Sequence, residues 1–478
     1  IDVTVTNVAN PLRIRTNTLA ATATNGGIGL VAETDMTLSS LSAPKGPITV
    51  TGLGTLAITQ SNSGGSQTFG AQGDLSFTSL TTTGLPVVPG PEDVGDITLT
   101  SVLGNIIGGS LNAAGSAKLT GNAVTFTKIT TDDDSTVLAR TGAVTGGAVD
   151  AGGSSGITGT GVSVDTVKTG GDSTLTGRTG AVQIKTSVNA GGSSFITGHG
   201  VFFDTIIADI NSEITSTSDI IGQLEEAGDT IKNVAGSGLG NTGILDVKVM
   251  RAKNIDLQAT KTLDVGKIEV GENLSLRADI IHALDVTQVP SGSDPLNVTL
   301  TGANGTVATL AKVNVDAPAG VVMPEVKVSE TQMTTTARSV QIVNAMVPIQ
   351  GASPLAGTFL LATPLQPVFV DDRSQTPKRV PASNSQYFLD GKPFAMTLNG
   401  TTTVTNSYVV AYDTSVQITD VLGVPFAGIS LVRDTVRNLR NTADPVSLPS
   451  ATDPSDLSEE EELDLTSLDD TEVEIDGV

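Results

Sequence analysis

Several residue types that soluble domains normally use are scarce or missing in this chain. Its 478 residues include no cysteine and no tryptophan, and aromatic residues make up only 3%. Without cysteine the chain forms neither disulfides nor thiolate metal sites. With so few aromatic rings, a core built on large aromatic side chains is excluded. The 53 glycines instead favour one long repeat structure over two or three ordinary domains.

Long apolar runs and basic clusters are missing as well. No stretch of eighteen apolar residues occurs, so we predict no membrane span. The formal charge is −24, and the chain has no basic stripe of the kind that neutralises phosphates, which argues against nucleic-acid binding. Residues 451–478 hold twelve acidic and no basic side chains. We expect this tail to be disordered unless a partner or a cation such as calcium orders it.

What the chain does contain is a repeated phrase. Residues 116–131 align with 154–169, 38 residues further on, and again with 193–208 after another 39. A second motif at 134–144 returns at 172–182. The long period is therefore two units of about nineteen residues, which is too short for helical pairs and too regular for a sandwich. A solenoid of stacked β-coils is the predicted fold.

The positions that stay apolar through the three copies give the physical reason. They alternate with Thr, Ser and Gly in the two-residue period of a half-buried strand, so one face of each strand is kept for a core. Stacking the coils at about 4.8 Å places each apolar position above its copy. The repeated apolar positions are Leu119, Val124, Phe126 and Ile129; then Ile157, Val162, Val164 and Val167; then Ile196, Val201, Phe203 and Ile206.

Outside this stretch the pattern weakens. Residues 1–131 carry blurred variants of the phrase, residues 219–232 interrupt it as a short helix or a long loop, and it resumes through Leu276. Beyond about residue 290 the tyrosines and prolines concentrate and strand-like segments flank a hairpin signal at Asp390 and Gly391. We therefore predict three parts: a β-solenoid at 1–289, a smaller β-rich domain at 290–450, and an acidic tail at 451–478.

Three short phrases carry a family resemblance. Gly-Asp-Leu-Ser-Phe (73–77), Gly-Asp-Ile-Thr-Leu (95–99) and Ala-Gly-Gly-Ser-Ser-x-Ile-Thr-Gly (151–159 and 190–198), in coils of about nineteen residues, resemble the repeat regions of filamentous-haemagglutinin-like bacterial exoproteins exported by two-partner secretion. The resemblance covers residues 1–285. It implies a right-handed parallel β-helix, a bacterial cell-surface or extracellular location, and an adhesive or fibre-forming role. The amino-terminal secretion domain of that family is not found, and the resemblance does not extend to residues 290–450.

Catalysis is the alternative, because β-helices also carry polysaccharide lyases and hydrolases. The best carboxylates are residues 132–134, near Arg140, and Asp165 with Asp204, which would form an acidic ladder. We interpret all of them as turn or strand-end residues, so no catalytic set is predicted. His199 and His282 are too far apart in the sequence to suggest a metal site, and His199 should face outward. Arg433, Arg437 and Arg440 recur at helical spacing, which indicates a solvated amphipathic helix rather than an anion site.

The sequence thus predicts an all-β extracellular structural or adhesive protein, such as a biofilm-matrix fibre. A host or cell-surface glycan or protein would be its receptor. The alternative is a β-helical carbohydrate-active or glycan-binding protein. Residues 1–6 already alternate like a strand, and the end coil of a solenoid is an open template. We therefore expect either head-to-tail self-association, in which a second copy covers this edge, or upstream sequence that covers it.

Overall fold

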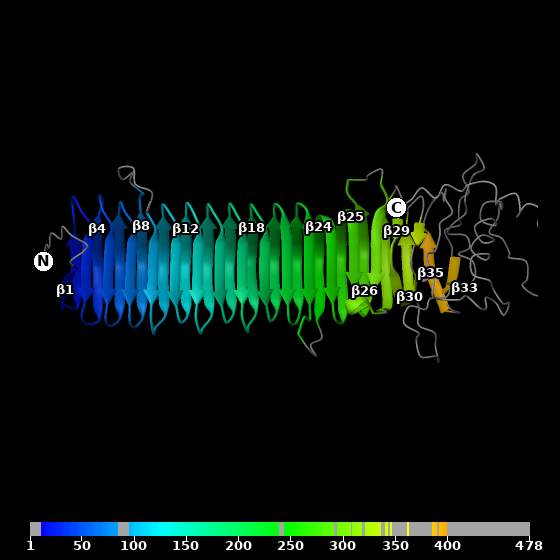
Figure 1. The fold of residues 1–478 in the computed structure, drawn as a ribbon, viewed down its shortest axis with the longest axis horizontal. Helices are drawn as coiled ribbons and strands as arrows, with labels where there is room; N and C mark the ends of the chain where they lie inside the picture. Colours follow the sequence, from blue (N-terminus) through cyan, green and yellow to red (C-terminus); the bar gives the residue numbers. More distant parts are fainter. Residues whose placement is uncertain are drawn as a thin grey trace, which may run out of the picture.

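The computed structural model describes residues 11–84, 95–238, 243–290, 294–306, 308–317, 321–335, 340–342, 345–346, 361–362, 385–389 and 392–398. Over these ranges the chain forms an all-β parallel solenoid of about 14 turns, with no α-helix. None of the described segments is a helix long and apolar enough to cross a bilayer. The coils stack in sequence order along the long axis of a rod, with their strands running across it (Figure 1).

Each coil in the first two thirds of the rod contributes one short and one long strand, and each strand pairs in parallel with its equivalent in the next coil. The short series is β1 (Leu12–Ile14), β3 (Ile28–Ala32), β5 (Ile48–Gly52), β7 (Gln67–Ala71), β9 (Ile97–Ser101), β11 (Ala117–Gly121), β13 (Ser135–Ala139), β15 (Ser155–Gly159), β17 (Ser173–Gly177), β19 (Ser194–Gly198), β21 (Asn211–Ser216) and β23 (Thr230–Ala235). The long series is β2 (Thr18–Thr22), β4 (Met36–Ala43), β6 (Leu56–Ser63), β8 (Leu75–Thr82), β10 (Ile106–Ala113), β12 (Val124–Thr131), β14 (Val144–Ala151), β16 (Val162–Thr169), β18 (Val182–Ala190), β20 (Val201–Ala208) and β22 (Ile220–Ala227).

The long strands bend at their middle. In β12 the first, third, sixth and eighth residues are buried, so the fourth and fifth both face outward. A straight strand cannot place two consecutive side chains on one face. The strand therefore turns a corner there, and with the short strand each coil encloses the core from three sides.

After β23 the short and long strands of a coil are joined into one continuous strand. In β24 (Ile244–Ala259) and β25 (Thr262–Arg277) one strand runs through both positions, since β24 pairs with β22 and with β23. The rest are β26 (Ile280–Gln288), β27 (Leu296–Thr301), the 3-10 turn η1 (Ala303–Gly305), β28 (Ala308–Asp316), β29 (Val321–Met323), β30 (Val326–Thr335), β31 (Val340–Ile342), β32 (Ala345–Met346), β33 (Leu361–Ala362), β34 (Ser385–Leu389) and β35 (Lys392–Leu398).

Parallel pairing continues beyond residue 290, because β27 pairs with β25 and β28 pairs with β26. The division of the chain at residue 289 stays a prediction. The predicted hairpin strands are confirmed: β34 and β35 pair antiparallel, and the Asp390–Gly391 signal between them lies outside the described residues. The acidic tail at 451–478 lies outside them too.

The predicted core is confirmed. All twelve apolar positions named from the repeat are at most 5% exposed, and they belong to one continuous cluster that runs the length of the solenoid. The predicted stacking partners need one correction. Ile157 and Ile196 do not touch as neighbours, because Leu175 lies between them in register. The long repeat of the sequence spans two coils, so equivalent residues in the copies are separated by one coil.

Two kinds of coil alternate in this stretch, and they explain why the full phrase returns only in every second coil. Leu119 pairs with Val137, and Val137 pairs with Ile157 in the following coil. The stretch of chain between the first two residues is shorter than the stretch between the second two. The difference lies in the turn from short to long strand. This turn is short at 122–123 and 160–161 but twice as long at 140–143 and 178–181. The hydrophobic pattern repeats every coil, while the turns repeat every second coil.

Large and small residues also alternate at one core position. The third residue of the long strand is Phe77, Phe126 or Phe203 in three coils, and the residue paired with each in the next coil is glycine. A Cβ added at Gly108, Gly146 or Gly222 would overlap the phenylalanine ring beneath it. Each ring therefore leans into the space that the next glycine leaves, which keeps the core close-packed at a fixed coil spacing.

The expected interruption at 219–232 is wrong. These residues form β22 and the start of β23, in register with the coils on both sides. Two inward positions that are apolar in neighbouring coils hold Glu225 and Asn233 here, both 0% exposed. These two polar residues hide the hydrophobic pattern from sequence analysis although the backbone continues unchanged.

Candidate functional surface

A column of polar side chains lines one edge of the rod. From β7 to β23 its members begin or directly precede the short strands, and further along they occupy the matching register positions inside β24, β25 and β27. Its first members alternate in type, and aspartates among them bind the backbone of the next coil. The Ser116 N–H donates to Asp96 Oδ1 at 2.7 Å, and the Ser154 N–H donates to Asp134 Oδ1, also at 2.7 Å. We call this the edge column: Ser66, Asp96, Ser116, Asp134, Ser154, Asp172, Ser193, Asn211, Thr230, Asn254, Asn273 and Asn297.

The edge column exists because turns interrupt the backbone ladder. A turn N–H that finds no carbonyl in the neighbouring coil needs another acceptor, and short Asp, Asn and Ser side chains provide one. The column therefore adds hydrogen bonds between coils where the sheet pairing stops. Its signal is present in the sequence as a Ser, Asp or Asn at the start of nearly every short strand from β7 onward.

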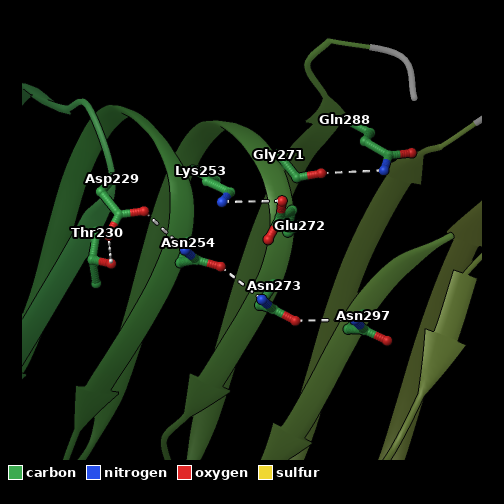
Figure 2. A network of polar contacts seen from close by, with 9 residues as sticks. All are labelled: Asp229, Thr230, Lys253, Asn254, Gly271, Glu272, Asn273, Gln288 and Asn297. Atoms are coloured by element: carbon green, nitrogen blue, oxygen red, sulfur yellow. Dashed lines mark hydrogen bonds and ion pairs between the residues drawn. The ribbon is translucent and has the colours of Figure 1, made fainter. Parts of the chain in front are cut away.

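In the second half of the rod the column changes to amide pairs (Figure 2). Asn273 donates to Asn254 Oδ1 at 2.6 Å, and Asn297 donates to Asn273 Oδ1 at 3.0 Å. Asn254 in turn faces Asp229 at 3.4 Å. An ion pair between Lys253 and Glu272, at 3.2 Å, runs beside this ladder. Here side chains bind side chains along the axis, and sequence analysis did not single out this ladder.

The first set of candidate carboxylates belongs to turns. Residues 132–134 form the turn between β12 and β13, and Asp134 is a member of the edge column. Arg140 lies in the other kind of turn, after β13. Its Nη2 donates to the backbone carbonyls of Ser101 and Val102, two coils away. The arginine is thus used to join turns, and the interpretation of these carboxylates as turn residues is confirmed.

Arg178 repeats this arrangement two coils later. Its Nη2 donates to the carbonyls of Ala139 and Arg140. Both arginines begin long turns and reach over the short turn of the coil between. Each guanidinium therefore connects successive long turns, and this contact has the two-coil period of the sequence.

The interpretation of Asp165 and Asp204 as strand-end residues is wrong, because each is the fourth residue of a long strand, at the bend of β16 or β20. Nor do the two aspartates form an acidic ladder. The two aspartates are separated by a coil that carries Lys185 in the bulged part of β18. Lys185 Nζ lies 2.9 Å from Asp165 Oδ1, and both side chains are about half exposed. The column therefore alternates in charge, and an isolated exposed pair of this kind contributes little to stability.

The two histidines lie far apart in the fold, as expected. His199 is exposed in a short turn, where its Nδ1 lies 2.8 Å from Thr217 Oγ1, and His282 faces outward from β26. Among the described residues no group of three or more His, Cys, Asp or Glu side chains could hold a metal ion. Arg433, Arg437 and Arg440 lie outside the described residues.

Ion pairs concentrate near the carboxyl end of the described solenoid. Glu269 contacts Lys267 at 2.6 Å and Arg251 at 2.8 Å, and its pKa is lowered mainly by the hydrogen bond from Lys267. Arg277 binds both carboxylate oxygens of Asp256, at 2.8 and 3.0 Å. These contacts link β24 to β25 across the coil boundary or lie within one coil. The surface there is charged and balanced, unlike the Thr- and Ser-rich faces of the earlier coils.

One exposed apolar pair stands out on the lateral face. Phe202 and Ile221 pair in register on β20 and β22, and they are 38% and 39% exposed. Neither was singled out from the sequence. Comparison of the chain with protein-family models, with curated proteins and with solved structures finds no match.

Proposed function

We propose that this protein is an extracellular structural or adhesive rod, and that it belongs with filamentous-haemagglutinin-like exoproteins. The observation that carries the proposal is the uninterrupted parallel pairing from β3 to β30, reinforced along one edge by the edge column. A rod whose coils are joined by backbone ladders, a common core and side-chain ladders transmits force along its axis. Of the acidic residues considered for catalysis, Asp134 instead holds a turn and Asp165 pairs with a lysine.

Single-molecule pulling of the full chain tests the mechanical role. One coil of about 19 residues adds roughly 65 Å when it is stretched, at about 3.4 Å per residue. We expect extension in steps of one or a few such lengths at sustained force. Smooth extension at low force, with no steps, would contradict a load-bearing rod.

Binding to cells or immobilised polysaccharide tests the adhesive role. We propose Phe202 and Ile221 as a contact, since an exposed apolar pair in register is a surface that a receptor can cover. The double variant Phe202→Ser/Ile221→Ser should bind less than the unchanged protein. Ile107→Ser is the matched control, because Ile107 occupies the same strand position on β10 and is 54% exposed.

Equal binding by all three proteins would exclude this pair as the contact. The same assay separates the enzymatic alternative. If the polysaccharide is shortened and new chain ends accumulate, the protein is a carbohydrate-active enzyme and the adhesive proposal fails.

We further propose that the rods associate head to tail. The end coils of a solenoid offer strand edges that a second copy can extend, and such a contact does not close into a ring. Sedimentation over a range of concentrations should show growing assemblies, and a chain lacking residues 1–8 should stay smaller. A full chain that remains monomeric at high concentration would contradict the proposal.

A further inference from the structure

The strongest anomaly in the core is a cluster of three buried polar side chains in the coil of β21, β22 and β23. Glu225, Ser212 and Asn233 are each 0% exposed. Ser212 Oγ donates to Glu225 Oε1 at 2.6 Å, and Asn233 Nδ2 donates to Glu225 Oε2 at 2.6 Å. The three side chains come from consecutive strands and meet inside the solenoid.

Each member breaks or ends a column of the core. Glu225 takes the inward position that Ile206 holds in the coil before and Met250 in the coil after. Asn233 lies between Ile214 and Leu257 in register. Ser212 is the last of five buried serines that stack through successive coils: Ser135, Ser155, Ser173, Ser194 and Ser212. The coil is therefore built around the carboxyl group.

No charged group of the described strands faces this carboxyl. The buried residues of β20, β21, β23 and β24 are uncharged, and Glu226, next to it in sequence, points outward to Arg251 at 3.6 Å. A buried carboxylate with two neutral donors and no cation is poorly compensated for the water it has lost. The neutral acid fits the site better. Asn233 Oδ1 has no hydrogen-bond partner, and a rotated amide would let it accept the proton of the acid.

We propose that this coil is a pH-sensitive joint of the solenoid, closed when Glu225 is protonated and prone to open locally when it is ionised. Burial raises the pKa of Glu225 from 4.5 to about 7, while the bonds from Ser212 and Asn233 oppose the shift. The contribution of the protonated form to stability is complete below about pH 4.5. It is lost as the pH rises towards 7, because the unfolded carboxyl ionises first.

Hydrogen exchange of the full chain tests the joint. We compare Glu225→Gln with the unchanged protein at the same pH, so that the intrinsic exchange rate cancels. A carboxyl pKa of about 7 in place of 4.5 corresponds to roughly a 300-fold change in the opening equilibrium. At pH 8 the amides of residues 212–235 should exchange up to about 300-fold more slowly in Glu225→Gln. At pH 4.5 the two proteins should exchange within about twofold of one another.

Glu226→Gln is the matched control, because it removes a neighbouring charge from the outer face. It should not reproduce the pH-dependent protection, and amides of residues 155–175 should not respond to either change. A second variant, Glu225→Leu/Asn233→Leu, places apolar side chains at both core positions, as in the neighbouring coils. It should remove the pH dependence of this coil.

Infrared spectra give an independent readout. At pH 6 the unchanged protein should show the carbonyl band of a protonated carboxylic acid, and Glu225→Gln should lack it. Absence of that band, equal exchange of Glu225→Gln and the unchanged protein at pH 8, or the same protection in Glu226→Gln would each overturn the proposal.

Discussion

The coils at 28–82 and the coils at 97–208 share one core but differ in their turns. In the first group the turns from short to long strand, at 33–35, 53–55 and 72–74, are all of one length, and Leu30, Val50 and Phe69 stack in register through them. In the second group long and short turns alternate, and the arginines of two long turns bind carbonyls two coils away. The comparison shows that the core positions must repeat in every coil, whereas the lengths of the turns can repeat over two coils.

The second difference is in packing. The third position of the long strand holds Leu38, Ile58 and Phe77 in the first group, which are all large. In the second group Phe126 is followed by Gly146. A column of similar side chains and a column of large–small pairs both fill the core, because only the local sum of volumes has to match.

The largest effect is expected from a charge placed in the core, and it tests whether the two groups of coils share that core. Val164→Asp and Val50→Asp each place an unpaired charge at a position that is 0% exposed. Each should lower the free energy of unfolding by about 4 kcal/mol, because nothing inward compensates the charge. Thermal melts and hydrogen exchange measure it. Thr158→Asp, on the outer side of β15, should be far milder, and equal melting of Val164→Asp and Thr158→Asp would show that the strand register is wrong.

The next effect tests the large–small pairs. Gly146→Val should cost about 2 kcal/mol, because its side chain meets the Phe126 ring. Phe126→Val/Gly146→Val should recover most of that loss, since Val and Ile stack at this position in the following coils. Gly156→Val is the control, because nothing lies within 4 Å of a Cβ there. Similar melting of the two single variants would argue against ring-to-glycine packing.

A smaller effect separates the turns. Arg178→Ala removes the guanidinium that joins residues 139–140 to the turn at 178–181. We expect a loss of about 1 kcal/mol, seen as faster hydrogen exchange in both turns. Lys185→Ala breaks only an exposed ion pair and should cost about 0.3 kcal/mol. If the two variants behave alike, the arginine contact does not join the alternating coils.

The smallest effect tests what the groups have in common. Asp134→Ala in the second group and Asp35→Ala in the first each remove an acceptor that binds a turn N–H of the next coil at 2.7 Å. Each should cost about 0.5 kcal/mol, and Asp→Asn at the same positions should cost less, because the amide oxygen still accepts. Melts of the four variants measure this. A clear loss of stability in only one group would mean that these aspartates do not play the same role in the two groups.

The sequence alone determined the coil. Alternating apolar positions specify which residues face inward, and the Ser or Asp before most of the short strands from β7 onward indicates a turn, because both are properties of a few neighbouring residues. For the same reason residues 132–134 could be interpreted correctly as a turn. What sequence could not supply was the neighbour of each residue: the pairing of Phe126 with Gly146, Lys185 between two aspartates, and the reach of Arg178 over an intervening coil.

The tertiary structure alone decided the coil at 212–235. Glu225 and Asn233 look like an interruption in the sequence, since charged and amide residues rarely occupy core positions. In the fold the coils on both sides impose the backbone path, and inside it the Asn233 amide donates a hydrogen bond to the Glu225 carboxyl group. The local sequence pattern specifies a repeat unit. Where a coil departs from that pattern, stacking on the neighbouring coils determines the conformation it adopts.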